Sequence, residues 1–172
     1  MKRAALAILC ACGYQPLYAS AGGEAYHVHL ARNRTASAIV AQEVLRGARE
    51  ELAKEGALAA GDDGYPRLEI EVLRADETSE GVTAIASPDG PVPRATASDL
   101  AVVARGFVAR RAGGAAELDT GDMRADAAAA VPQTASAEIW QREDSLRAVA
   151  HRLGGRIALK ILGHPVVTAP SD

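Results

Sequence analysis

The chain has 172 residues, enough for one domain, and its 19 Lys and Arg against 22 Asp and Glu give a formal net charge of −3 at pH 7. This balance argues against a nucleic-acid-binding protein, which needs a basic face to neutralise phosphates. One Trp, four Tyr and one Phe also leave few rings on which bases or sugars could stack.

The N-terminus has the pattern of an export signal. Lys2 and Arg3 precede a short apolar run that ends in the sequence LCAC at residues 9–12. A charged start, an apolar middle and a small-residue exit are typical of a cleaved secretory signal. The exit itself resembles a bacterial lipobox, in which the residue after the cut is a cysteine that receives lipid.

Residue size selects one of the two cysteines. Ala11 before Cys12 is small enough for a peptidase subsite, whereas Leu9 before Cys10 is too large, so we predict Cys12 as the lipid attachment site. The alternative is an apolar N-terminus with two incidental thiols. It is less favoured because the chain has no other cysteine. The apolar run is also much shorter than the ~18–20 residues needed to span a bilayer.

The first elements of the domain are a strand and a helix. Residues 25–30 alternate in character and predict a short strand. Candidate N-caps for the helix, which runs to about residue 56, are Asn33, Thr35 and Ser37. Apolar residues recur every three or four positions along it, so one face packs on an apolar surface. These positions are Ile39, Val40, Val44, Leu45, Ala48 and Leu52.

Three strands follow. Residues 67–73 alternate between apolar and charged side chains, which predicts a half-buried strand. A polar patch interrupts its extension to about residue 86 and suggests a bulge, and a proline-rich loop comes next. Residues 95–111 form a second long strand, and Gly113-Gly114 suits a hairpin turn. Residues 117–131 then return as a strand, although their alanine run favours strand only weakly.

The last element is an amphipathic helix over residues 134–162, ended by Gly163 and Pro165. Gly154-Gly155 weakens its middle and indicates either a bend or a close approach to a neighbour. The order β-α-β-β-β-α predicts an α/β (α+β) fold, with two amphipathic helices on one face of a mixed four-stranded sheet.

The chain is therefore expected to divide into four segments. In order, they are a lipoprotein signal peptide (residues 1–11), a lipid-anchored tether (12–24), the α/β domain (25–164) and a disordered C-terminal tail (165–172).

No catalytic motif is present. The chain lacks G-x-S-x-G, a P-loop, a dinucleotide-binding glycine pattern and H-E-x-x-H. His27 and His29 would lie on one side of a strand, as a metal pair might, but no cysteine or close carboxylate completes a ligand set. We expect ordinary strand histidines, no metal, no cofactor and no enzymatic activity.

Two features have both a functional and a structural interpretation. Arg105, Arg110 and Arg111 cluster near the end of the third strand and could contact lipid phosphates or an acidic partner. A solvated strand face is the more favoured interpretation. Trp140 could anchor an interface, but we expect it to cover the end of the sheet as part of the core.

The residues after the lipobox add a family resemblance. The sequence CGYQPLY at residues 12–18 resembles the C-G-[FY]-x-P-L-Y start of mature lipopolysaccharide-assembly lipoproteins, the LptE family. The order of elements is also similar to that family. The resemblance implies a non-enzymatic outer-membrane lipoprotein that faces the periplasm and plugs the LptD β-barrel. It would assist the assembly of that barrel and help deliver lipopolysaccharide to the outer leaflet.

Cys12 is the residue that the resemblance carries over, as the lipid site. Arg105, Arg110 and Arg111 stay candidate contacts for lipopolysaccharide or the partner. An accessory periplasmic lipoprotein of a lipid-transport ABC system is the alternative function, and a lipid-anchored hydrolase is a third and less favoured one.

Overall fold

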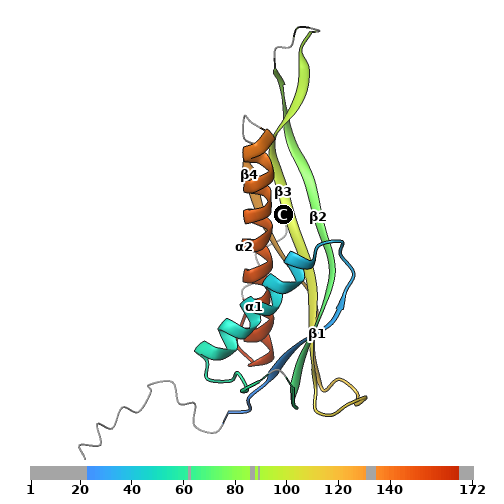
Figure 1. Ribbon diagram of the computed structural model, residues 1–172, viewed down its shortest axis with the longest axis vertical. Coiled ribbons are helices and arrows are strands. Elements are labelled where there is room, and N and C mark those ends of the chain that lie inside the picture. Colours follow the sequence, from blue (N-terminus) through green and yellow to red (C-terminus); the bar gives the residue numbers. More distant parts are fainter. Residues whose placement is uncertain (1–22, 62, 86–87, 89, 131–134, 167–172) are drawn as a thin grey trace, which may run out of the picture.

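The computed structural model describes residues 23–166 except 62, 86–87, 89 and 131–134. These residues form two helices and four strands in the order β-α-β-β-β-α, which confirms the expected fold class (Figure 1). The elements are β1 (His27–Asn33), α1 (Ala38–Lys54), β2 (Arg67–Ile85), β3 (Val92–Ala109), β4 (Leu118–Ala130) and α2 (Ala135–Ile161).

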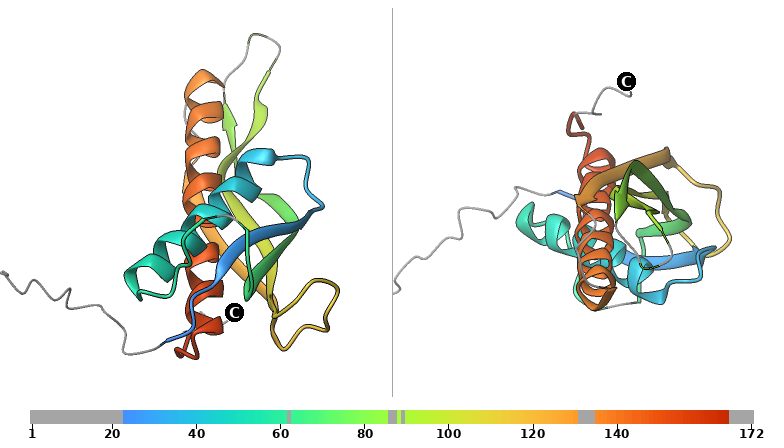
Figure 2. Two further views of the ribbon diagram at one scale, coloured as in Figure 1. Left: turned by 60° about the horizontal axis from the view of Figure 1, so that its bottom comes forward. Right: turned by 90° about the horizontal axis from the view of Figure 1, so that it is seen from above.

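The four strands form one mixed sheet in the order β1-β2-β3-β4. β1 runs parallel to β2, so α1 serves as the crossover between them, and β2, β3 and β4 form an antiparallel meander. Both helices lie on the same face of the sheet (Figure 2). α1 packs on β1 and β2, whereas α2 packs on β3 and β4.

The turn from β1 into α1 uses all three residues predicted as candidate caps. Ser37 is the N-cap, and its hydroxyl accepts a hydrogen bond from the Val40 amide at 3.3 Å. Asn33 Oδ1 accepts from the Thr35 amide and hydroxyl at 3.0 and 2.8 Å, and its Nδ2 donates to the Ser37 carbonyl at 3.1 Å. These bonds satisfy polar groups that the start of a helix otherwise leaves unpaired.

The core lies between the two helices and the sheet. Most of the apolar positions predicted from the sequence are buried, whereas Ile39 is 38% exposed. Full burial of each large aliphatic side chain is worth roughly 1.5–3 kcal/mol. The largest fully buried side chains are Leu52, Leu68, Ile70, Leu100, Leu153, Ile157, Val40, Val44, Val72, Val102, Val108 and Val149.

The helices cross with their backbones in direct contact. A Cβ on Gly47 of α1 would lie 1.9 Å from the His151 carbonyl oxygen, and one on Gly154 of α2 would lie 1.9 Å from the Val44 oxygen. Of the two alternatives for Gly154-Gly155, a bend or a close approach, the structure shows the close approach at Gly154. Gly106 of β3 allows α2 to pack closely on the sheet, because a Cβ there would lie 2.4 Å from Cγ2 of the Ile157 side chain.

β2 and β3 are much longer than their neighbours. β1 pairs with β2 only as far as Val72, and β4 pairs with β3 only between Ala97 and Val108. A register shift between Val72 and Arg74 supplies the expected bulge. Beyond it, β2 and β3 continue with β4 as far as the Ala97–Ala130 pair, and residues 82–85 of β2 and 92–95 of β3 then form a two-stranded ribbon that projects past the N-terminal end of α2 (Figure 1).

One core prediction is wrong. Trp140 is 66% exposed, as is its neighbour Ile139, because both lie on the first turns of α2 and face away from the sheet's core. The signal peptide at residues 1–11, Cys12 and the tether as far as residue 22 lie outside the described residues, as do residues 167–172 of the tail.

The helix crossing gives a matched pair of substitutions. Gly154→Ala should destabilise the protein by about 3 kcal/mol, at the upper end for overpacking, because the three atoms that meet the new Cβ, in Val44 and Ala48, all belong to the backbone. Gly155→Ala should instead be neutral or stabilise by up to about 1 kcal/mol through helix propensity. Its Cβ would lie 3.7 Å from Glu51 Oε2, an ordinary contact. Urea unfolding of both variants tests this, and equal effects would contradict the crossing.

Candidate functional site

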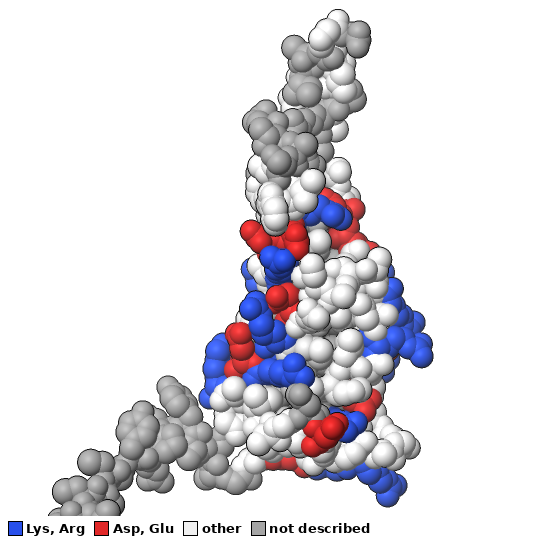
Figure 3. Space-filling model, viewed as in Figure 1, with Lys and Arg blue, Asp and Glu red and all other residues white. Residues whose placement is uncertain are grey.

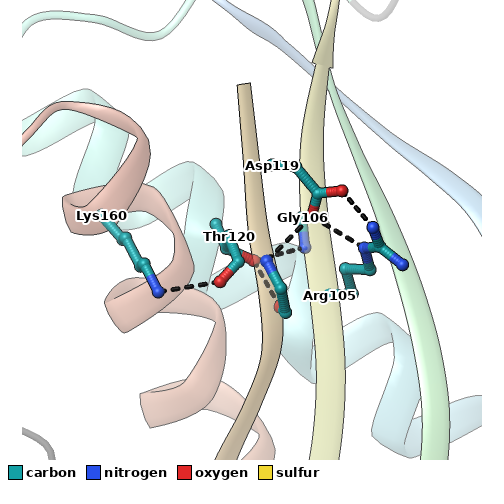
Figure 4. Close-up of polar contacts among 6 residues, drawn as sticks. Arg105, Gly106, Asp119, Thr120 and Lys160 are labelled. Carbon is teal, nitrogen blue, oxygen red and sulfur yellow. Dashed lines mark hydrogen bonds and ion pairs between the residues drawn. The ribbon is translucent and has the colours of Figure 1, made fainter. Parts of the chain in front are cut away.

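The structure separates the three candidate arginines into different surroundings. Arg105 projects from β3 and makes two hydrogen bonds with Asp119 of β4, with Nε donating to Oδ1 at 2.7 Å (Figure 4). The Arg105 guanidinium, followed by the Gly121 amide, lowers the pKa of Asp119 to about 2. Arg105 is therefore held in a specific ion pair on the strand surface.

A β-bulge in β4 brings Asp119 next to Arg105. Residues 120 and 121 of β4 together oppose Gly106 of β3, and Gly121 has a φ of +64°, the left-handed conformation that favours glycine. The buried Thr120 hydroxyl accepts from the Gly106 amide at 2.9 Å and donates to the Gly121 carbonyl at 2.8 Å. Lys160 of α2 donates to the Thr120 carbonyl at 2.8 Å, so the bulge also ties α2 to the sheet (Figure 4).

Arg110 and Arg111 lie at the β3–β4 turn. Arg110 pairs with Glu117 across that turn and with Glu24 just before β1, and these hydrogen bonds raise its pKa. Glu24 also accepts from the Tyr26 hydroxyl at 3.1 Å, which fastens the entry to β1. Arg111 is exposed and makes no ion pair within the described residues. Of the three candidates, it is the one whose charge stays open to an anionic ligand.

The outer face of the helix pair carries a shallow groove of ≈ 600 Å³ at the crossing of α1 and α2. Its basic residues have acidic neighbours. Arg46 pairs with Glu43 at 2.6 Å and Arg147 with Glu143 at 2.6 Å, while His151 lies 2.9 Å from Glu50. Acidic and basic side chains are accordingly interleaved on this side of the molecule (Figure 3). The groove is a surface of mixed charge.

A second groove, of ≈ 580 Å³, lies where β1 ends and α1 begins. Its walls are the first turn of α1, the stretch of β2 from Leu73 to Glu77, and the N-terminal turns of α2. Its apolar residues include Ile39, Leu73, Ile139 and Leu146. The apolar periodicity of the sequence did not predict this groove. The signal that could have found it is the apolar residue Ile139, which lines the groove and is 66% exposed.

His27 and His29 lie in different surroundings. His27 Nδ1 lies 3.1 Å from the Gly61 carbonyl oxygen, and the ring packs against Gly64, whereas His29 is exposed. In the part of the chain that the structure describes, no three His, Cys, Asp or Glu residues converge as metal ligands. None of the helices described there is both long and apolar enough to cross a bilayer.

Sequence comparison alone finds no relative: no family model matches the chain, and no curated protein sequence does. Solved structures are similar in fold. A "putative lipoprotein" from Caulobacter crescentus CB15 has a TM-score of 0.52 at 14% identity, over 76% of this chain and 88% of that one. At this identity, the similarity shows a shared fold.

Two further lipoprotein structures were matched. A minor lipoprotein from Acinetobacter baumannii has a TM-score of 0.46 at 15% identity, over 78% of this chain and 92% of that one. The rare lipoprotein B from Shewanella oneidensis has a TM-score of 0.47 at 16% identity, over 77% of this chain and 94% of that one.

The Arg105–Asp119 pair predicts a specific pH dependence of stability. The folded pKa of Asp119, about 2, lies below the ordinary value of about 3.9, so the pair stabilises the fold above pH 4. That contribution is lost as the pH falls towards 2. Asp119→Asn should therefore be less stable than the wild type at pH 7, and the gap should narrow steadily as the pH falls from 4 to 2. Urea unfolding across this range measures it, and a pH-independent gap would refute the role of the charge.

The exposure of Trp140 predicts its fluorescence. Because it is the chain's single tryptophan and is 66% exposed, the emission of the isolated protein should resemble that of tryptophan in water and be quenched readily by acrylamide. Trp140→Ala should change the free energy of unfolding by no more than about 0.5 kcal/mol. A blue-shifted, protected emission would show that the ring is buried.

Proposed function

We propose that this chain is a non-enzymatic, lipid-anchored lipoprotein of the outer membrane, on its periplasmic face. It plugs an LptD-like β-barrel, assists the assembly of that barrel and helps deliver lipopolysaccharide to the outer leaflet. The observation that carries this proposal is the sequence CGYQPLY at residues 12–18, placed directly before a β-α-β-β-β-α domain. The fold shared with the Caulobacter lipoprotein supports it.

Lipidation at Cys12 would place the domain close to a membrane. Several acyl chains, each worth ~0.8 kcal/mol per buried CH₂, hold a protein stably where a single chain does not. The eleven residues from 13 to 23 span at most about 35–40 Å when fully extended. The first residues of the domain would therefore lie within about 40 Å of the bilayer surface.

The outer face of the sheet suits a polar surrounding such as a barrel lumen. It carries charged side chains of both signs on every strand of the meander. Glu71 of β2 pairs with Arg34 at 2.7 Å, and Arg105 of β3 pairs with Asp119 of β4. On β4, Arg124 lies 3.7 Å from Asp126. Such paired charges stay hydrated or exchange partners with a polar wall at little cost.

Lipidation is tested by mass spectrometry of the mature N-terminus. The wild type and Cys10→Ser should both begin at an acylated Cys12, because Cys10 leaves with the signal. Cys12→Ser should carry no acyl chain and should leave the membrane fraction. An unmodified Cys12 in the wild type would overturn the proposal.

The partner is tested by purifying the full-length tagged chain from detergent-solubilised envelopes. Recovery of a large LptD-like β-barrel in stoichiometric amount supports the proposal. Recovery of an inner-membrane permease in its place contradicts it and favours the accessory lipoprotein of a lipid-transport ABC system.

A further inference from the structure

The distal part of β2 has an open backbone edge. β3 pairs with one side of β2 along its whole length, whereas β1 pairs with the other side only from Arg67 to Val72. From Arg74 to Ile85, no described strand lies on that second side. Unpaired N–H and C=O groups along such an edge form a ready template for another strand.

The groove of ≈ 580 Å³ runs beside this edge. It contains Leu73 to Glu77 of β2 in one wall and the start of α1 and the N-terminal turns of α2 in the others. Within it, Ile39 is 38% exposed and Ile139 is 66% exposed. A chain that paired with β2 here would continue the line of β1 and could bury its apolar side chains in the groove.

Charges protect only the near part of the edge. Arg74 pairs with Asp76 at 3.0 Å, and Glu77 pairs with Arg142 of α2. From Gly81 to Pro88, the sequence GVTAIASP has no charged residue, and Val82 is 76% exposed. Natural edge strands commonly carry charges that prevent pairing, so this uncharged stretch is suited to a partner. The one departure from extended geometry within it is at Gly81, where φ is +65°.

The end of the ribbon formed by β2 and β3 has no third strand beside it among the described residues. A two-stranded hairpin by itself is marginally stable in water, and in the described part of the chain residues 82–85 of β2 and 92–95 of β3, beyond the end of β4, pair only with each other. A third strand would supply the missing ladder of hydrogen bonds. A docked helix or a lipid chain would leave the backbone edge unpaired, so the occupant that satisfies both features is an extended polypeptide.

We propose that the β2 edge from Arg74 to Ile85, with its adjoining groove, is the docking site for an extended segment of the β-barrel partner. That segment adds to the sheet as a strand in line with β1. The identity of the partner rests on the proposed function, whereas the location and the mode of binding rest on the edge and the groove.

The test compares the same kind of substitution at two ends of the sheet. Val82→Lys puts a charge on the open edge, whereas Leu118→Lys puts one at the start of β4, where the apolar side chain is 45% exposed. When the full-length chain is used to capture the co-expressed barrel, Val82→Lys should lower recovery by on the order of tenfold. Leu118→Lys should leave it unchanged. Ala84→Lys, a second exposed edge position, should reproduce the loss.

Thermal unfolding separates binding from folding, since all three variants should keep the wild-type midpoint. A photo-crosslinker at Thr78 should react with the barrel, and one at Asp122 of β4 should not. If the wild type captures the barrel and the edge variants do so equally well, the docking site is overturned and the proposed function stands. If the wild type captures no barrel, both are overturned.

Discussion

The arrangement of the whole domain depends on the close backbone approach that Gly47 and Gly154 permit where α1 crosses α2. α1 covers β1 and β2, and α2 covers β3 and β4, so the crossing of the helices fixes how the two halves of the sheet are covered together. A side chain at either glycine would occupy the space of the other helix's carbonyl oxygen. Val44 and Leu153 are fully buried beside this contact, which shows that close approach and core packing are achieved at the same place.

The same arrangement gives the molecule one packed end and one open end. The inward-facing buried residues of β2 stop at Val72, next to the bulge, and the strand then continues without β1 beside it. The chain enters β1 at the packed end, opposite the ribbon (Figure 1). A lipid anchor before β1 would therefore hold the packed end near the membrane through its tether and leave the ribbon free to reach a partner.

Periodicity in the sequence was enough to predict the elements, their order and the mixed sheet, because each inward-facing stripe is formed within one element. Partners between elements were harder to predict. A close approach was one of two interpretations of Gly154-Gly155, but nothing local identifies Val44 as the residue whose carbonyl oxygen Gly154 meets. The Arg105–Asp119 pair depends on a bulge at Thr120 and Gly121, which shifts the register of β4. Trp140 was wrongly expected in the core, because helical spacing alone does not show which turns of a helix pack against the sheet. The lipid site is a matter of sequence alone, since Cys12 lies outside the described residues.

The position of α2 in the chain has a consequence for biosynthesis. It is the last element, yet it covers β3 and β4 and supplies the buried Val149, Leu153 and Ile157. A nascent chain that has completed the meander still exposes the apolar face of half its sheet until the final helix emerges. The apolar face can therefore be buried only once α2 is available, and a product truncated before α2 would present that bare sheet to chaperones and proteases.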